Sequence, residues 1–153
     1  MTDWSQTWTY VNDAWHEGNV PIIGAREHAF WLGSSVFDGA RSFEGVVPDL
    51  DLHCKRLNNS AKALEMEPTK TPDEIETLCR EGVSKFAPDA ALYIRPMYYA
   101  EDAHPLGIPP LASSTKFIIS IYETPMPEPK GFAITVSPFR RPTQECMPLD
   151  AKA

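Results

Sequence analysis

The spacing of hydrophobic positions predicts a helix over residues 51–66. Its apolar residues recur at intervals of four and three positions, at Leu57, Ala61 and Leu64. This spacing places them on one face of a helix, with polar residues on the other face. Either Asp49 or Asp51 can accept hydrogen bonds from the free amides of the first turn. We therefore expect one amphipathic helix in this part of the chain.

A second helix is predicted to begin at Thr71. Thr71 and Glu74 have the spacing of a capping box, in which each side chain bonds the backbone amide of the other residue. Pro72 suits the first helical position because its missing N–H group would have no partner there. The apolar stripe then continues through Ile75, Leu78, Gly82 and Phe86.

Runs of β-branched and aromatic residues predict strands on both sides of these helices. Residues 8–15 form one such run, and a turn at Gly18 and Asn19 followed by residues 20–23 predicts its hairpin partner. Further strands are predicted over residues 90–99, 116–122 and 132–136. Strands, then helices, then strands indicate an α+β fold, with two helices packed on an antiparallel or mixed sheet in a small two-layer domain.

Residues 36–43 predict one more strand, with an unusual face. Alternation places Phe37, Gly39, Arg41 and Phe43 on the same side. Glycine weakens a strand by about 0.5 to 1 kcal/mol relative to alanine. That cost is best explained if another group approaches the backbone closely. The simpler alternative is core packing, with Arg41 extending toward an edge.

Prolines suggest how the chain is divided. The sequence contains 15 prolines, which gather in loops rather than in repeats. Successive prolines over residues 124–131 disfavour a helix or central strand and favour an extended spacer. We predict an α+β domain over residues 1–123, a linker over 124–131, and the start of a second domain over 132–153.

Charge and cysteine content narrow the possible partners. The formal net charge of −7 provides no basic face for nucleic acid or anionic lipid. No basic leader precedes an apolar run, and no apolar run is long enough to cross a bilayer. Cys54, Cys79 and Cys146 lack the spacing of a metal site or a disulfide framework. We expect a cytoplasmic protein without a metal.

Three motifs and a lysine give the clearest functional signal. The motifs are HAFWLGSSVFDGARSFEG over residues 28–45, HCKRL over 53–57 and YIRP over 93–96, and the lysine is Lys152 in AKA. Their order resembles fold-type IV pyridoxal-phosphate aminotransferases, most closely the branched-chain amino acid aminotransferases. The resemblance implies a cofactor-dependent transaminase of branched-chain amino acid biosynthesis, acting as a homodimer or higher homo-oligomer. Members run about twice this length, so it also implies an N-terminal half followed by the start of a barrel-like, cofactor-binding domain.

The same resemblance implies roles for two cationic residues. Lys152 would carry pyridoxal 5'-phosphate as an imine and then transfer the proton between substrate and cofactor. Taken alone, a lysine so near the end of a sequence is more often a solvated surface charge. Arg56 would bind the cofactor phosphate, for which a planar fork of donors is suited. Without the resemblance, Arg56 reads as a solvated arginine on a helix.

The substrate pocket implied by the resemblance includes four residues of the predicted strands. Phe37 and Gly39 would line it, while Arg95, supported by Tyr93, would take the distal carboxylate of glutamate or 2-oxoglutarate. Otherwise a buried Arg95 needs a protein carboxylate, for which Asp102 is a candidate. His28 and His53 are expected to be structural.

One departure leaves the substrate open. Branched-chain enzymes usually carry tyrosine at the position before Gly33, where this chain has Leu32. A related D-amino acid or amine transaminase, or an aminodeoxychorismate lyase, is therefore an alternative. A noncatalytic dimerisation module, with two helices on a sheet and no cofactor, is an alternative of another class.

Overall fold

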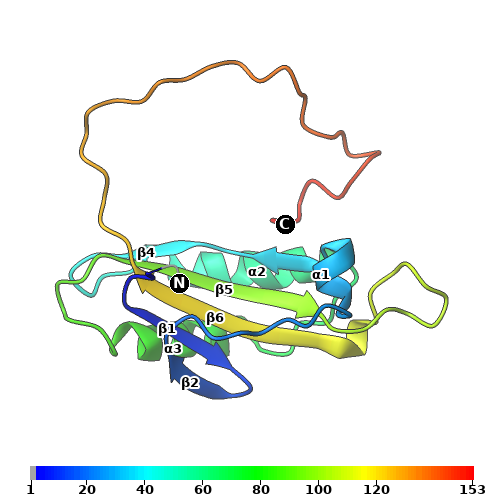
Figure 1. The fold of residues 1–153 in the computed structure, drawn as a ribbon, viewed down its shortest axis with the longest axis horizontal. Coiled ribbons are helices and arrows are strands. Elements are labelled where there is room, and N and C mark those ends of the chain that lie inside the picture. Colours follow the sequence, from blue (N-terminus) through cyan, green and yellow to red (C-terminus); the bar gives the residue numbers. More distant parts are fainter. Residues whose placement is uncertain (1–2) are drawn as a thin grey trace.

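A computed structural model describes residues 3–153 of the chain and places a six-stranded antiparallel sheet at its centre. Figure 1 shows two long helices on one side of this sheet and a long segment that leaves it and returns. The elements are, in chain order, β1 (Thr7–Val11), β2 (Ala14–Glu17), α1 (His28–Leu32), β3 (Ser35–Phe37), β4 (Ala40–Ser42), α2 (Leu50–Ala63), α3 (Pro72–Val83), β5 (Leu92–Ala100), the 3₁₀ turn η1 (Ala112–Ser114) and β6 (Thr115–Glu123).

The sheet is built around the long pair β5 and β6. The strand order is β2-β1-β6-β5-β3, and β4 also pairs with β5 beyond the end of β3. Tyr93 on β5 lies opposite Tyr122 on β6 and also opposite Arg41 on β4. Because opposed residues in an antiparallel pair point to the same face, these three side chains share one side of the sheet.

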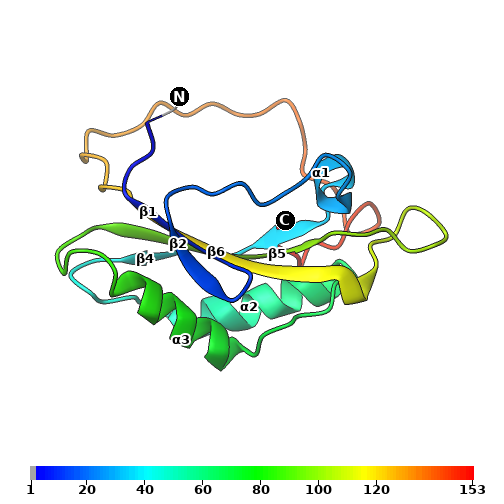
Figure 2. The ribbon, with the colours of Figure 1, turned by 60° about the horizontal axis from the view of Figure 1, so that its bottom comes forward.

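The core lies between the sheet and the helix layer. Along β5, Leu92, Ile94 and Tyr98 are buried, and α2 contributes Leu57 and Ala61 to the same core. Figure 2 shows α2 and α3 below the sheet, with α1 and the chain leading to the C-terminus on the other side. The predicted two-layer α+β domain with two principal helices is therefore confirmed.

The two helix starts differ in how they are capped. Thr71 and Glu74 form the predicted capping box, and Pro72 begins α3. At the start of α2, however, neither Asp49 nor Asp51 supplies the predicted side-chain cap. Asp49 is the N-cap residue but has φ 51°, in the left-handed region, and its side chain makes no capping hydrogen bond. An N-cap side chain normally reaches the first turn from an extended backbone, which Asp49 does not have.

The hairpin turn was placed wrongly by the sequence pattern. β1 and β2 pair across a two-residue turn at Asn12 and Asp13, both with positive φ, and residues 20–23 form no strand. Asparagine and aspartate tolerate this left-handed backbone, so their pair makes the tight turn that joins antiparallel strands. The short helix α1 was also not predicted.

Two other strand predictions need correction. The strand predicted over 36–43 is divided into β3 and β4 at Asp38 and Gly39. The strand predicted over 132–136 does not form, and Phe132, Ile134 and Val136 are 83%, 93% and 92% exposed. A strand needs a neighbour to bond its backbone, and no described segment pairs with these residues.

Across residues 3–153, no helix is both long enough and apolar enough to span a membrane.

Candidate active site

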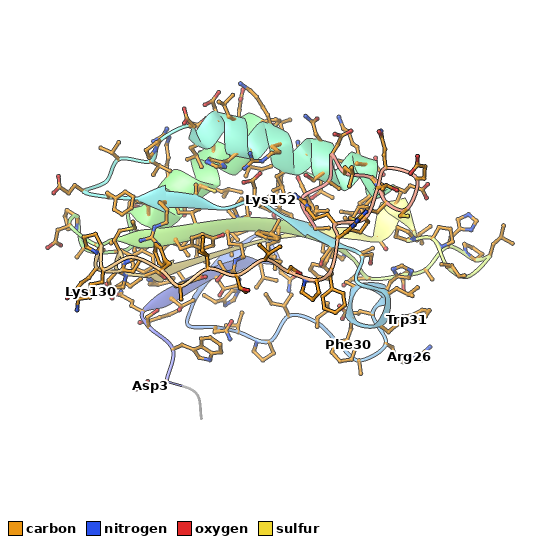
Figure 3. The ribbon with its side chains drawn as sticks, turned by 90° about the horizontal axis from the view of Figure 1, so that it is seen from above. Asp3, Arg26, Phe30, Trp31, Lys130 and Lys152 are labelled. Carbon is orange, nitrogen blue, oxygen red and sulfur yellow. The ribbon has the colours of Figure 1, made fainter. Side chains whose placement is uncertain are left out.

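Lys152 lies against the sheet, although most of the segment that precedes this residue runs away from the sheet. Figure 3 shows this residue beside the strands, whereas Lys130 of the same segment lies toward one end of the molecule. The Lys152 amide donates to Ser60 Oγ at 3.0 Å, and its carbonyl accepts from the Phe37 amide at 3.1 Å. Ser60 belongs to α2 and Phe37 to β3, so the lysine backbone is held between a helix and the sheet edge. A frayed surface lysine does not fit this placement.

A buried carboxylate, Asp38, joins the two predicted cofactor-binding residues. Its side chain has no exposed surface and accepts from Arg56 Nε at 2.6 Å and Nη2 at 2.7 Å. The Lys152 amine lies 3.4 Å from Asp38 Oδ1. Two further groups bond the same carboxylate: His53 Nδ1 at 2.9 Å and the Gly39 amide at 2.7 Å. Arg56 and Lys152, which are far apart in sequence, therefore contact one anion.

The surrounding donors keep Asp38 ionised. Burial by itself would raise the Asp38 pKa, but hydrogen bonds from Arg56, His53 and the Gly39 amide, together with the Lys152 charge, lower the pKa below its ordinary value. The hydrogen bond to Asp38 in turn raises the pKa of Arg56. The arrangement is a carboxylate anchor that holds two cations at one place on the strand edge.

Sequence reasoning missed Asp38 and Ser60 as members of this site. The strand pattern places Asp38 on the face opposite Phe37 and Gly39, where a buried carboxylate needs a cationic partner. That requirement was the available signal for Asp38. His53 was expected to be structural and lies beside Asp38, whereas His28 bonds Ser34 Oγ and the Ile108 carbonyl, away from this site.

The Lys152 amine also reaches the other face of the sheet. Its Nζ lies 5.0 Å from the centre of the Phe37 ring, within the range of a cation–π contact. Phe37 and Asp38 point to opposite faces of the strand, and β3 is the last strand of the sheet. The amine therefore sits at the strand edge, between the carboxylate on the helix side and the aromatic ring on the open side.

Gly39 is required by a close approach from Tyr93. A Cβ atom at Gly39 would lie 2.2 Å from the Tyr93 hydroxyl oxygen and 2.8 Å from Tyr93 Cζ. Real side chains do not tolerate such distances, so any larger residue would displace the Tyr93 ring. The close approach expected from the glycine is therefore present, and the approaching group is a side chain of β5.

Arg95 occupies the same open face and has a different partner from the candidate Asp102. Its guanidinium lies 5.1 Å from the Tyr93 ring centre and 5.4 Å from the Tyr122 ring centre, and its Nη2 donates to the Tyr122 hydroxyl. Asp102 makes no ion pair with it among residues 3–153. The nearby Arg41 donates to the Thr124 carbonyl and lies over the Phe43 ring.

Six predicted residues therefore form one continuous region along β3 and β5. Arg56 and Lys152 both contact Asp38. Phe37 lies beside them on the open face of the sheet, which is the face that α2 and α3 do not cover. The remaining members follow along that face: Gly39, Tyr93 and Arg95. Leu32, at the end of α1, is 42% exposed and offers only an apolar side chain.

The donor chemistry fits a ligand that carries both a phosphate and an aldehyde. The Arg56 side chain is half exposed, and its Nη1 has no protein acceptor within residues 3–153, so the guanidinium keeps a donor for an anion. The Lys152 amine is partly exposed and able to react with an aldehyde when deprotonated. Both groups contact the same carboxylate, which orients them and leaves some of their hydrogen-bond donors free.

Comparison with known proteins identifies a matching family. The family model described as Amino-transferase class IV matches residues 35–152. These bounds include the Asp38 cluster and the open face of β3, β4 and β5.

Relatives with curated names are consistent with this match. A probable branched-chain-amino-acid aminotransferase of Rickettsia typhi is 34% identical over 131 residues, which cover 82% of this chain and 43% of the relative. The branched-chain-amino-acid aminotransferase of Escherichia coli K12 is 30% identical over 149 residues, covering 91% and 47%. The chain thus spans about half the length of the curated relatives it matches.

Solved structures resemble the chain closely. An aminotransferase from Brucella abortus bound to the cofactor PLP matches with a TM-score of 0.93 and 57% identity, covering 97% of this chain and 53% of that one. A branched-chain amino acid aminotransferase from Escherichia coli has a TM-score of 0.79 and 26% identity, covering 96% and 49%.

Proposed function

This chain belongs to the class IV aminotransferase family, and on that premise we propose that it forms part of a pyridoxal 5'-phosphate-dependent transaminase. The amino donor is a branched-chain L-amino acid and the acceptor is 2-oxoglutarate. The observation that carries the proposal is the convergence of Arg56 and Lys152 on the buried Asp38 carboxylate. A guanidinium and a primary amine at one strand edge support a site for the cofactor's phosphate and aldehyde.

Lys152 and Arg56 divide the work of holding the cofactor. Pyridoxal phosphate supplies an aldehyde for covalent attachment as a Schiff base and an electron-withdrawing ring that makes the substrate α-hydrogen acidic. Lys152 Nζ would provide the attaching amine, and the freed amine would move the proton from the substrate α-carbon to the cofactor. Arg56 binds the phosphate through donors that Asp38 leaves free. Asp38 orients both side chains.

The open face of the sheet binds the substrate. Phe37 presents an apolar ring beside the Lys152 amine, and that ring contacts an aliphatic substrate side chain. Gly39 allows the Tyr93 hydroxyl to lie over the strand, where it bonds the substrate. Arg95 supplies a cation for the distal carboxylate of the acidic substrate.

The extended segment supports a proposal about the rest of the molecule. Residues 1–123 form the α+β domain, 124–131 the linker, and 132–153 the start of a C-terminal cofactor-binding domain. Four large apolar side chains of this last segment are more than 80% exposed: Phe132, Ile134, Val136 and Phe139. Such exposure is unusual unless another surface covers them. The whole protein is proposed to be a homodimer.

The decisive experiment is to locate the cofactor by mass. The whole protein should purify yellow with pyridoxal phosphate, and borohydride reduction should fix the cofactor mass on a peptide containing Lys152. A Lys152→Ala variant should lose both the fixed mass and amino transfer from leucine to 2-oxoglutarate. A colourless protein that does not bind added pyridoxal phosphate would instead support the noncatalytic dimerisation module.

Leu32 supports a second candidate with the same cofactor. It places no hydroxyl at the end of α1, where the branched-chain pattern has tyrosine. Comparing leucine with D-amino acids, chiral amines and aminodeoxychorismate distinguishes the candidates. Turnover of one of these without leucine turnover would replace the branched-chain assignment and keep the reaction class.

A further inference from the structure

Arg95 lies against two adjacent tyrosine rings on the open face of the sheet. Tyr93 and Tyr122 lie opposite each other on β5 and β6, and their ring centres are 5.6 Å apart. The Arg95 guanidinium lies 5.1 Å from one ring centre and 5.4 Å from the other. Contact with both rings restricts where the guanidinium can move.

The two tyrosine hydroxyls have different tasks. The Tyr93 hydroxyl lies over Gly39, as the close approach to the glycine shows. The Tyr122 hydroxyl accepts the hydrogen bond from Arg95 Nη2. Tyr122 is therefore the residue whose polar atom fixes the orientation of Arg95, a role that the sequence motif alone assigns to Tyr93.

Arg95 is oriented without being neutralised. No carboxylate pairs with it among residues 3–153, and its buried Nε has no hydrogen-bond partner there. A buried N–H group without an acceptor is costly, and a carboxylate is the acceptor that matches an arginine fork. A neutral hydroxyl therefore leaves the positive charge available for an incoming anion, which a protein aspartate would have cancelled.

We infer that Tyr122 is a specificity-determining residue that positions Arg95 for the distal carboxylate of a dicarboxylic substrate. This inference rests on the proposed function, and it assigns the selection of the acidic substrate to the Tyr122 hydroxyl. The tyrosine rings beside Arg95 offer apolar surface to an aliphatic side chain. The binding of such a side chain does not depend on the Tyr122 hydroxyl. Tyr122 thus affects one substrate of the reaction pair and not the other.

The test compares matched dicarboxylic and aliphatic ligands in Tyr122→Phe, using the whole enzyme with cofactor. The variant keeps the ring and removes the hydroxyl. The KM for 2-oxoglutarate and the Kd for glutarate should rise about tenfold, the usual effect of losing one hydrogen bond that orients a charged group. The KM for an aliphatic 2-oxo acid and the Kd for 4-methylvalerate should stay within about twofold.

Tyr10→Phe is the matched control. It removes a hydroxyl that bonds Asp13 at the β1–β2 turn, on the core side of the sheet rather than on the face that carries Arg95, and it should change neither ligand class. Thermal unfolding of each variant checks that the fold is kept. Equal weakening of both ligand classes in Tyr122→Phe, or no change in either, would overturn the inference.

Failure of the proposed function would look different. Wild-type protein that binds no cofactor and transfers no amino group contradicts the transaminase proposal. Glutarate binding followed by calorimetry needs no turnover. Selective weakening of glutarate by Tyr122→Phe in inactive protein would still support the positioning role, whereas wild-type protein that binds no glutarate would reject it.

Discussion

Asp38 shows how much can depend on one buried carboxylate. It accepts hydrogen bonds from Arg56, His53 and the Gly39 amide, and the Lys152 amine lies 3.4 Å away. The free energy of this cluster is smaller than that of a fully buried ion pair, because half of the Arg56 side chain is exposed and water screens its charge. The Asp38 side chain itself is fully buried, so water cannot replace these donors. Removal of the Asp38 carboxylate therefore affects both the fold and the site.

Replacing Asp38 with asparagine should destabilise the protein by about 1 to 3 kcal/mol, because the cations keep their charge and lose the negative charge and one acceptor oxygen that they share. Urea unfolding at neutral pH measures this loss. Asp51→Asn is the matched control, since Asp51 pairs with Lys55 on the exposed surface of α2 and should change stability little. Equal midpoints for the two variants would show that the buried cluster adds nothing.

The low pKa of Asp38 predicts a pH dependence of stability. A carboxylate whose pKa is lower when folded stabilises the protein above the unfolded pKa of about 3.9, and this contribution disappears as pH falls through the folded pKa. The difference in unfolding free energy between wild type and Asp38→Asn should therefore be constant from pH 7 to about 5 and shrink below about 4. A difference that grows on acidification would contradict the assignment.

At the scale of elements, the junction of β3 and β4 depends on a side chain from β5. The chain does not change direction at Gly39, because Phe37 and Ala40 pair with Met97 and Ile94 of the same neighbouring strand. The junction has no space for a side chain at position 39, because the Tyr93 hydroxyl lies over the glycine. The open face thus owes its shape to contacts between neighbouring strands.

Gly39→Ala should destabilise the protein by about 1 to 3 kcal/mol, because the new methyl group must displace the Tyr93 ring. In a Tyr93→Leu background the same substitution should cost clearly less, because the shorter side chain leaves room for the methyl. A double-mutant cycle from urea unfolding gives the coupling between the two positions. Additive effects would mean that Tyr93 does not restrict position 39.

On the scale of the whole molecule, residues 124–153 touch the α+β domain at few places. Thr124 bonds Arg41 and the Ala91 carbonyl, and Lys152 bonds the Phe37 amide, Ser60 and Asp38. The hydrophobic core is formed by residues between Tyr10 and Ile121, so it is complete without this segment. The sheet and its two helices should therefore fold independently of it.

A shortened chain ending at Glu123 should keep a cooperative thermal transition and the circular dichroism of an α+β domain. Its midpoint should lie within a few degrees of the value for residues 1–153, since about 1 kcal/mol shifts the midpoint by roughly 4 to 8 °C in domains of about 60 to 100 residues and by roughly 2 to 4 °C in domains of about 150 to 250 residues. It should also aggregate less, because exposed apolar residues such as Phe132 and Ile134 are gone. Loss of the transition would reject residues 1–123 as a domain.

Local sequence signals determined the two long helices, most strands and the residue types of the site. The α3 capping box, the apolar stripe of α2 and the alternation around Phe37 each depend on residues a few positions apart, so periodicity was enough to find them. The motifs also predicted Arg56, Tyr93, Arg95 and Lys152 as the polar members of one site. Where spacing was ambiguous, as at the first hairpin turn, the prediction failed.

Only the tertiary structure decided how these residues meet. Asp38 contacts Arg56 and Lys152 because α2 packs beside β3 while a long segment returns to the same strand edge. Tyr122 faces Arg95 because β5 and β6 pair in one particular register. These contacts join different elements, and no local pattern encodes them. They follow from burying the helix face and from completing the backbone hydrogen bonds of the sheet, which are properties of the whole fold.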